Sequence, residues 1–463
     1  MRETLTPIDT AWLHMEDPSN LMMVTGVLTF TGKIDLPTFK RTFSERLLRY
    51  ERFRQRVVHG PTPLQRPHWR TDPSLAVDAH VHAIALDDRQ DHDELMRLIG
   101  ELASTGLDFD RPLWEVHLIE DFRGDSLAVM RFHHAIADGS AMVRVMYDLM
   151  DPSSDASPSN DRPDLAQRKH SAFPGHRLLE PARQALKMGG QVSNILSREL
   201  RESLRRPTRA FELGQTLGQG AAVLGNALAM APDHDTPFKG QLGKRKHVAM
   251  SAPVALQAVK DIGAATGTKV NDVLLSAMAG ALGHYLAEER GVDVAQVSIR
   301  AVVPVDLRRQ PSTKLGNEFG VVFLELPIGI DNPLQRLYAI KHGMDKLKAS
   351  PEPYVFFSLL NVFGMAPDVM ETQIVNLFGS KATLVMTNVK GPPEPLHFAG
   401  RAVKDMTFWV PQSGRLGMGV SIMSYAGEVR LGVITDAGLV PDPQTITTRF
   451  AEEFTRLRGR LAG

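Results

Sequence analysis

The sequence contains no cysteine and carries no excess of charge of either sign. The absence of cysteine excludes disulfides, thiolate metal sites and a cysteinyl acyl-enzyme, and it is consistent with a reducing cytoplasm. Lysine and arginine number 53 and aspartate and glutamate also number 53, so the chain has no overall field that would attract nucleic acid or a strongly anionic membrane. We therefore expect no nucleic-acid partner.

Long, purely apolar segments are also lacking. The longest segment without charge, 213–232, contains several glutamine, asparagine and glycine residues, so we interpret it as soluble or surface-lying and reject a transmembrane helix. The opening residues lack the apolar core of a secretory signal. These patterns predict a cytoplasmic protein.

Several catalytic signatures are missing as well. No Gly-x-Ser-x-Gly occurs, which excludes the nucleophile elbow of a serine hydrolase. No Gly-x-x-x-x-Gly-Lys-Ser/Thr occurs either, and Gly218 and Gly220 lack the strand and third glycine of a dinucleotide fingerprint.

What the chain does have is enough apolar residues, 43% of 463, to bury two cores. Strands and helices alternate in both halves, which predicts two α/β domains. We place the first domain at 1–150, a linker with a basic amphipathic helix at 151–240, and the second domain at 241–463. The expected strands include 21–31, 77–86, 114–119, 297–305, 321–326, 382–389, 416–424 and 428–435, and the expected helices include 36–50, 93–105, 254–266, 270–286, 333–347, 354–378 and one that begins at 442–443.

The most informative stretch is His133-His134-Ala-Ile-Ala-Asp138-Gly139, which follows a strand-like run and opens an amphipathic helix. Neighbouring side chains on an extended segment point to opposite sides, so one imidazole can face a channel while the other turns inward. A neutral imidazole is suited to removing a proton from an alcohol. Asp138 could orient an imidazole or pair with an arginine, and Gly139 permits a backbone angle that a side chain would resist.

Metal binding is an alternative use of histidine. His134 and Asp138 have i, i+4 spacing and could join His133 around an ion, and His80 and His82 share one face of the strand predicted at 77–86. For His80 and His82 a solvated strand face is the simpler interpretation. We expect no metal and no cofactor.

The motif resembles the His-His-x-x-x-Asp-Gly signature of the acyl-CoA-dependent acyltransferase superfamily, and more specifically the bacterial wax ester synthase/diacylglycerol acyltransferase family. Other segments are similar to elements of that family in the same order along nearly the whole chain. They are Pro7–Leu13 through Glu16, Pro112-Leu113-Trp114, Asn271-Asp272, Leu315-Gly316-Asn317-Glu318-Phe319-Gly320, and Asn388-Val389-Lys390-Gly391-Pro392, in which Lys390 stands where the family usually has proline.

The resemblance implies two chloramphenicol-acetyltransferase-like domains, each a mixed sheet with helices, and an active-site tunnel between them. It implies that His134 is the general base, that His133 is structural and that Asp138 holds the loop; Arg308 is a guess at the partner of Asp138. It also implies transfer of a long acyl chain from acyl-CoA to diacylglycerol or a fatty alcohol. Alternatives are another hydroxyl acceptor, such as a polyketide, and a non-catalytic lipid-binding protein of the same fold.

Supporting roles remain open for several residues. The amides of Asn271 and Asn388 could reach a reaction intermediate, or Asn271 could cap a helix with Asp272 in its first turn. Thr387 is a weaker candidate for an oxyanion donor, and Trp114 is expected to form pocket wall or domain packing. Gly417 and Gly419 could leave room for an acyl chain or mark a bend.

Contact with lipid is a further expectation. Apolar residues at helical spacing in 177–205 lie opposite a face rich in arginine, which is typical of a helix on a membrane or lipid droplet and also of a helix packed across a domain junction. The protein would then be cytoplasmic and peripheral to the inner membrane or to lipid inclusions.

Overall fold

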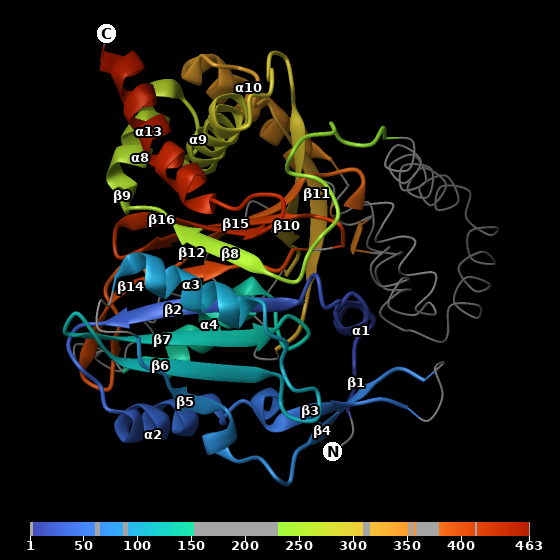
Figure 1. Cartoon of the computed structure of the whole chain (residues 1–463), viewed down its shortest axis with the longest axis vertical. Coiled ribbons are helices and arrows are strands. Elements are labelled where there is room, and N and C mark those ends of the chain that lie inside the picture. Colours follow the sequence, from blue (N-terminus) through green and yellow to red (C-terminus); the bar gives the residue numbers. More distant parts are fainter. Residues whose placement is uncertain are drawn as a thin grey trace, which may run out of the picture.

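The computed structural model describes residues 3–60, 65–86, 91–151, 230–308, 315–350, 353, 356–357, 379–412 and 414–462. Two mixed sheets lie one above the other, each with helices packed on it, and the two ends of the chain lie at opposite poles (Figure 1). The predicted architecture of two α/β domains is thereby confirmed. The expected helix at 177–205, most of the segment 213–232 and nearly all of the expected helix at 354–378 lie outside the described residues.

The N-terminal sheet has six strands in the order β13-β14-β2-β7-β6-β5. Its central pair, β2 and β7, is antiparallel and places Met23 opposite His133. A small sheet in the order β1-β4-β3 lies beside it. The bounds are β13 His397–Phe398, β14 Arg401–Trp409, β2 Met23–Phe30, β7 Asp125–His133, β6 Trp114–Phe122, β5 Val81–Ala83, β1 Glu3–Thr4, β4 His68–Thr71 and β3 Gln55–Val58.

Four helices accompany this sheet, and each begins behind a side chain that accepts a hydrogen bond from the first turn. Asp35 accepts from the backbone N–H of Thr38 at 2.8 Å, and Asp138 accepts from that of Ala141 at 3.1 Å. The helices are α1 Pro7–His14, α2 Leu36–Leu47, α3 His92–Ala103 and α4 Gly139–Leu149, with short 3₁₀ turns at Glu51–Arg54 and Val77–Ala79.

The C-terminal sheet runs β11-β10-β12-β15-β16-β8, with β9 also paired to β16. Helices α8, α9, α10 and α13 cover its outer face (Figure 1). The bounds are β11 Phe319–Leu326, β10 Ile299–Asp306, β12 Leu384–Lys390, β15 Met418–Tyr425, β16 Glu428–Asp436, β8 Lys246–Met250, β9 Val254–Ala255, α8 Leu256–Thr266, α9 Val270–His284 with a π turn Tyr285–Glu289, α10 Pro333–Ala349 and α13 Pro443–Ala462.

Strand β14 joins the two halves. It comes from the C-terminal part of the sequence but pairs with β2 of the N-terminal sheet, with Trp409 opposite Thr25. Its end packs on the other sheet, because the indole N–H of Trp409 donates to the carbonyl of Ala249 at 3.0 Å and a Cβ on Gly432 would lie 2.4 Å from the carbonyl oxygen of Phe408. This crossing holds the two sheets at a fixed separation along one seam.

Two local predictions need correction. The sequence predicts a strand over 77–86, but the structure has a 3₁₀ turn and only the short β5 there. Strand β14 is an element that the sequence analysis missed, because charged and polar residues interrupt its apolar alternation.

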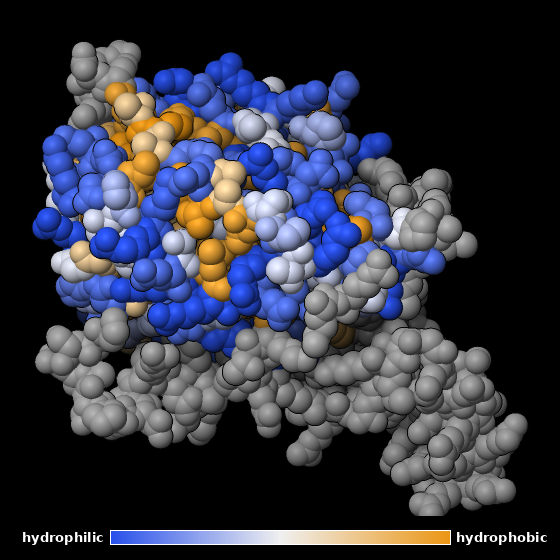
Figure 2. Space-filling view, turned by 90° about the horizontal axis from the view of Figure 1, so that it is seen from below, coloured by the Kyte–Doolittle hydropathy of each residue, from blue (hydrophilic) through white to orange (hydrophobic). Residues whose placement is uncertain are grey.

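Seen from below, the described residues are largely hydrophilic, with hydrophobic residues gathered from the upper left toward the centre of the view (Figure 2). Within the described residues, Tyr338 and Leu461 are the large hydrophobic side chains that are exposed. Scattered exposed hydrophobic residues of this kind are normal for a folded protein.

Candidate active site

The adjacent histidines lie at the end of β7, His133 as its last residue and His134 just after it, and their side chains enter different environments. His133 is buried, and its Nδ1 accepts a hydrogen bond from the backbone N–H of Ala135 at 3.1 Å. Its Nε2 lies 3.5 Å from a carboxylate oxygen of Glu16, and the ring of Phe109 packs edge-on against it. His133 therefore has both ring nitrogens directed into the protein interior.

His134 turns the other way and lines a cavity. Its backbone N–H donates to the carbonyl of Met22 at 2.8 Å, which continues the pairing of β7 with the chain before β2. The indole of Trp12 stacks on the imidazole with ring centroids 4.0 Å apart, and Phe319 lies 6.1 Å away on another side. Burial lowers the pKa of His134 to about 4, against the opposing attraction of the Asp138 carboxylate. The imidazole is therefore neutral at physiological pH.

Only one nitrogen of the His134 ring has a hydrogen-bonding partner in the described part of the chain. Nδ1 lies 3.1 Å from the side-chain oxygen of Asn317. The described residues provide no hydrogen bond to Nε2, so this nitrogen could form one with a molecule bound in the cavity. A neutral imidazole with a free ring nitrogen can accept a proton.

Asp138 secures the loop behind the histidines. Its carboxylate accepts two hydrogen bonds from the guanidinium of Arg308, at 2.7 and 2.5 Å, and one from the backbone N–H of Glu318 at 3.0 Å. The same guanidinium donates to the carbonyl of Gly316 at 2.8 Å. The suggested pairing of Asp138 with Arg308 is thus found, and it ties the start of α4 to the loop between β10 and β11.

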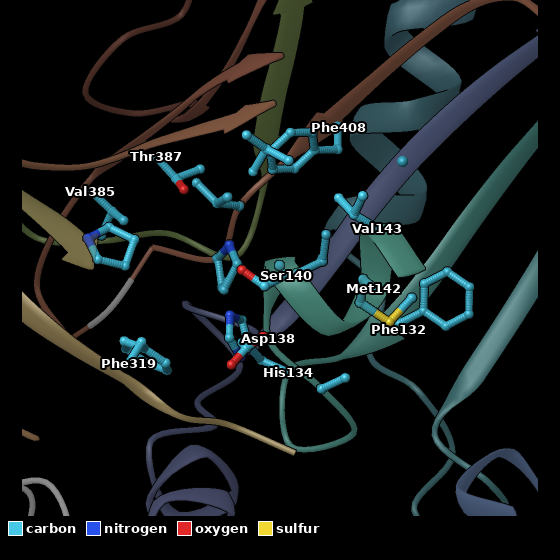
Figure 3. Close-up of a pocket in the computed structure, with 18 of the residues that line it drawn as sticks. Phe132, His134, Asp138, Ser140, Met142, Val143, Phe319, Val385, Thr387 and Phe408 are labelled. Carbon is cyan, nitrogen blue, oxygen red and sulfur yellow. The ribbon is translucent and has the colours of Figure 1, made fainter. Parts of the chain in front are cut away.

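The cavity has a volume of about 360 Å³ and lies between the two sheets. Figure 3 shows His134, Asp138 and Ser140 on one side of it and Phe319, Val385 and Thr387 on the other. Its wall is mostly apolar and rich in methionine and phenylalanine, including Met130, Met142, Met146, Met406, Met423, Phe132, Phe323, Phe356 and Phe408. A site of this size and polarity is suited to an apolar ligand.

The predicted amide pair is brought together at the end of β12. The side-chain N–H of Asn388 donates to the side-chain oxygen of Asn271 at 2.9 Å. Asn388 and Thr387 line the cavity, whereas Asn271 lies behind them on the first turn of α9. Asp272 is buried, and its carboxylate accepts from the backbone N–H of Lys269 at 2.9 Å, so this residue contributes to helix capping.

Trp114 lies in the core of the N-terminal domain and is not a wall of the cavity. Its indole N–H donates to the carbonyl of Phe53 at 2.9 Å, and its ring stacks on His80 with centroids 4.4 Å apart. The Nδ1 of His80 lies 2.7 Å from the carbonyl oxygen of Trp114. His80 is therefore a buried core residue. It lies neither on a solvated strand face nor in a metal site, which were the two interpretations offered by the sequence.

Within the described residues, no cluster of three or more histidine, aspartate or glutamate side chains has a geometry that could hold a metal ion. This applies to His133, His134 and Asp138, whose side chains are directed toward Glu16, the cavity and Arg308 respectively. In the same part of the chain, no helix is both long and apolar enough to cross a membrane.

Three glycines have surroundings that the sequence did not reveal. Gly139 does not have a positive φ, and a Cβ there would make an ordinary contact with Val389 at 3.8 Å. Gly417 and Gly419 leave no room for an acyl chain, because a Cβ would lie 2.6 Å from a methyl carbon of Leu439 at the first and 2.8 Å from the carbonyl oxygen of Val410 at the second. The lack of a side chain at Gly417 and Gly419 allows Leu439 and Val410 to pack closely against the backbone.

Sequence reasoning assigned no role to Asp9, Trp12 or Asn317, although each belongs to a segment that resembles the family. All three contact His134 directly or through one neighbour. Trp12 lies 122 positions and Asn317 lies 183 positions from His134 in the sequence, so local spacing could not reveal these contacts. The signal that could have indicated these three residues was their position, as polar or aromatic residues, inside segments that resemble the family's motifs.

Comparison with known proteins identifies the family of the chain. The family model described as wax ester synthase/diacylglycerol acyltransferase catalytic domain matches residues 5–274, and the WS/DGAT C-terminal domain matches residues 315–458. A probable diacylglycerol O-acyltransferase of Mycobacterium tuberculosis is 27% identical over 98% of this chain and 95% of its own length. A putative diacylglycerol O-acyltransferase of the same species is 28% identical over 98% of this chain and 90% of its own.

Solved structures show the same fold. The wax ester synthase/diacylglycerol acyltransferase from Marinobacter aquaeolei superposes with a TM-score of 0.68 at 22% identity and covers all of both chains. The first condensation domain of the calcium-dependent antibiotic synthetase superposes with a TM-score of 0.61 at 14% identity, over 100% of this chain and 96% of that one. The expected two-domain acyltransferase fold is confirmed, and the chain belongs to the wax ester synthase/diacylglycerol acyltransferase family.

Proposed function

We propose that the protein transfers a long acyl chain from acyl-CoA to the hydroxyl group of a diacylglycerol or a long-chain alcohol, with His134 as the general base. The observation that carries this proposal is the neutral imidazole of His134, with Nε2 unpartnered among the described residues, in a largely apolar cavity between the two sheets. The family membership supports the reaction class.

The chemistry follows from the thioester, which is already activated. Nε2 of His134 takes the proton of the acceptor hydroxyl as its oxygen forms a bond to the thioester carbonyl carbon. The tetrahedral intermediate then collapses, the carbon–sulfur bond breaks, and the thiolate of CoA receives the proton from the imidazolium. No cofactor is required beyond the acyl-CoA co-substrate.

The cavity wall has two contributions to make in this scheme. Its methionine and phenylalanine side chains exclude water, which would otherwise compete with the acceptor and hydrolyse the thioester. Thr387 and Asn388 are the polar groups on the wall formed by β12, and we propose that one of them donates a hydrogen bond to the developing oxyanion.

Contact with lipid is part of the proposal, because diacylglycerols and long-chain alcohols partition into bilayers and lipid inclusions. We propose a cytoplasmic protein that meets such surfaces peripherally. The arginine-rich segment at 177–205 is the candidate for this contact on its sequence pattern.

The experiment is thiol release from palmitoyl-CoA, followed with a thiol reagent and with detection of the ester product. Because the protein has no cysteine, it contributes no background to the signal. Three reactions are compared: without acceptor, with hexadecanol and with dioleoylglycerol. Release that depends on an acceptor and matches ester formation supports the proposal.

Binding of palmitoyl-CoA by calorimetry without thiol release in any reaction would contradict the proposal and favour a lipid-binding protein. Release only with carrier-protein thioesters or with a polyketide alcohol would favour the other acceptor class.

A further inference from the structure

Asn317 occupies a fixed position beside His134. It follows Gly316, whose carbonyl accepts hydrogen bonds from Arg308 at 2.8 Å and from the backbone N–H of Asp138 at 3.4 Å. The ion pair between Asp138 and Arg308 therefore holds the residue immediately before Asn317. The amide of Asn317 reaches across from the C-terminal half of the chain to the histidine on the N-terminal sheet.

The hydrogen bonds fix which end of this amide faces which group. Its nitrogen, Nδ2, lies 2.9 Å from the backbone carbonyl oxygen of His134 and 2.7 Å from Oδ1 of Asp9. A backbone carbonyl can only accept a hydrogen bond, so the NH₂ end must point toward it. The oxygen end, Oδ1, is then the atom that lies 3.1 Å from Nδ1 of His134.

The protonation of the imidazole follows from this orientation. An amide oxygen cannot donate, so Nδ1 of His134 must carry the proton in the hydrogen bond. A neutral imidazole has one N–H, and Nε2 is therefore the unprotonated nitrogen. Free imidazole samples both tautomers, but only this one presents a lone pair on the nitrogen that is directed away from Asn317.

We infer that Asn317 is a positioning residue that selects the Nδ1–H tautomer of His134 and so presents Nε2 as the proton acceptor. Asp9 supports it from behind, because its buried carboxylate accepts from the same amide nitrogen and prevents the amide from turning over. The role of Asn317 in catalysis rests on the function proposed above, whereas the tautomer itself does not.

Nuclear magnetic resonance tests the tautomer in the native protein without turnover. Long-range ¹H–¹⁵N correlation spectra of the protein labelled with [¹⁵N]histidine distinguish protonated from unprotonated ring nitrogens, and the His134 signal is identified by its loss in His134→Gln. We expect Nδ1 to be protonated and Nε2 to be unprotonated at pH 7. The opposite assignment would overturn the inference even if the protein were an active transferase.

Substitution tests the cause. Asn317→Leu keeps a similar side-chain volume and removes both ends of the amide, so we expect the Nδ1–H preference to be lost and kcat to fall roughly 10- to 100-fold, with the KM for palmitoyl-CoA changed much less. Asn20→Leu is the matched control, because the amide of Asn20 also donates to a backbone carbonyl, that of Gly414 at 2.8 Å, but does not line the cavity. We expect Asn20→Leu to leave both the tautomer and kcat unchanged.

Asp9 provides the conservative comparison. Asp9→Asn retains an oxygen that can accept from Asn317 and should keep kcat within a few-fold of the native value, whereas Asp9→Leu should behave like Asn317→Leu. An unchanged His134 tautomer in Asn317→Leu would contradict the inference, whatever happened to activity. Absence of transferase activity in the native protein with the Nδ1–H tautomer present would instead count against the proposed function alone.

Discussion

The two sides of the chain after β7 show how the same residue type acquires different properties. On one side, His133 is enclosed by the backbone of Ala135, the carboxylate of Glu16 and the ring of Phe109. On the other side, His134 is stacked on Trp12, hydrogen-bonded to Asn317 and open to a cavity at Nε2. The first histidine has its polar atoms directed at protein groups, and the second keeps one nitrogen available.

Nδ1 has a protein partner in both histidines, so the difference between them lies in the surroundings of Nε2. Both ring nitrogens of His133 are directed at protein groups. The remaining nitrogen of His134 has no hydrogen-bonding partner among the described residues, and its ring lines the cavity, so it is the histidine that a substrate could reach. The comparison makes distinct predictions for substitutions on the two sides.

The largest effect is expected for His134→Ala. Removal of the base should lower kcat for ester formation roughly 10²- to 10⁴-fold, and circular dichroism and the thermal midpoint should stay close to native because the ring lies at the edge of a cavity. Product formation from palmitoyl-CoA and hexadecanol measures it. Retention of more than a tenth of native kcat would place the base elsewhere.

The next effect is expected for Asp138→Ala, which removes the closer carboxylate partner of the largely buried guanidinium of Arg308 and leaves only that of Asp306, 3.8 Å away. Loss of one partner from such a pair should reduce the free energy of unfolding by about 3–5 kcal/mol, measured by denaturant titration. Asp78→Ala is the matched control, because Asp78 pairs with Lys40 on the exposed surface, and it should leave unfolding unchanged. Equal effects of the two substitutions would show that the Asp138 pair does not hold the loop.

A smaller effect is expected for His133→Phe. The substitution keeps an aromatic ring but leaves the backbone N–H of Ala135 without its acceptor, so the free energy of unfolding should fall by about 1–3 kcal/mol. Because Nε2 of His133 faces Glu16 rather than the cavity, kcat should change by much less than in His134→Ala. A loss of kcat equal to that of His134→Ala, in a protein that remains folded, would remove the distinction between the two histidines.

The smallest effect is expected for Gly139→Ala. Gly139 has no positive φ and begins α4, and a Cβ there meets only an ordinary contact. Alanine should therefore raise the free energy of unfolding by about 0.4–1 kcal/mol through the unfolded state. A clear loss of stability would mean that glycine is required for the backbone after all.

Much of this arrangement could be predicted from local sequence. The strand that ends at the histidines and the helix that follows Asp138 both follow from apolar periodicity, and the opposite directions of His133 and His134 follow from the geometry of an extended segment. The family resemblance added the fold and the reaction class, which periodicity could not supply.

The rest depends on contacts between distant segments. Trp12 and Asn317 meet His134 only because the two sheets stack, and β14 crosses between them although its own sequence alternates poorly. The suggestion that Gly417 and Gly419 leave room for an acyl chain failed for the same reason. Gly417 and Gly419 are set by the neighbours that pack on them, and neither neighbour is evident from the strand sequence.

The central claim is that His134, held neutral by burial, is the group that accepts the proton. The pKa of this histidine is lowered to about 4 from about 6.5 in an unfolded chain, so the neutral form persists through the physiological range and is lost only as the pH falls through about 4. For the same reason, the stability that the neutral ring contributes is fully present above about pH 6.5 and is lost as the pH falls toward 4.

The most direct measurement is the pH dependence of kcat/KM for ester formation from palmitoyl-CoA and hexadecanol, over the range in which the protein stays folded. We expect a constant value from about pH 8 down to about pH 5 and a decline below it, with no such dependence in the residual activity of His134→Ala. A decline centred near pH 6.5 or above, or the same profile in His134→Ala, would contradict the assignment of a neutral, buried His134 as the base.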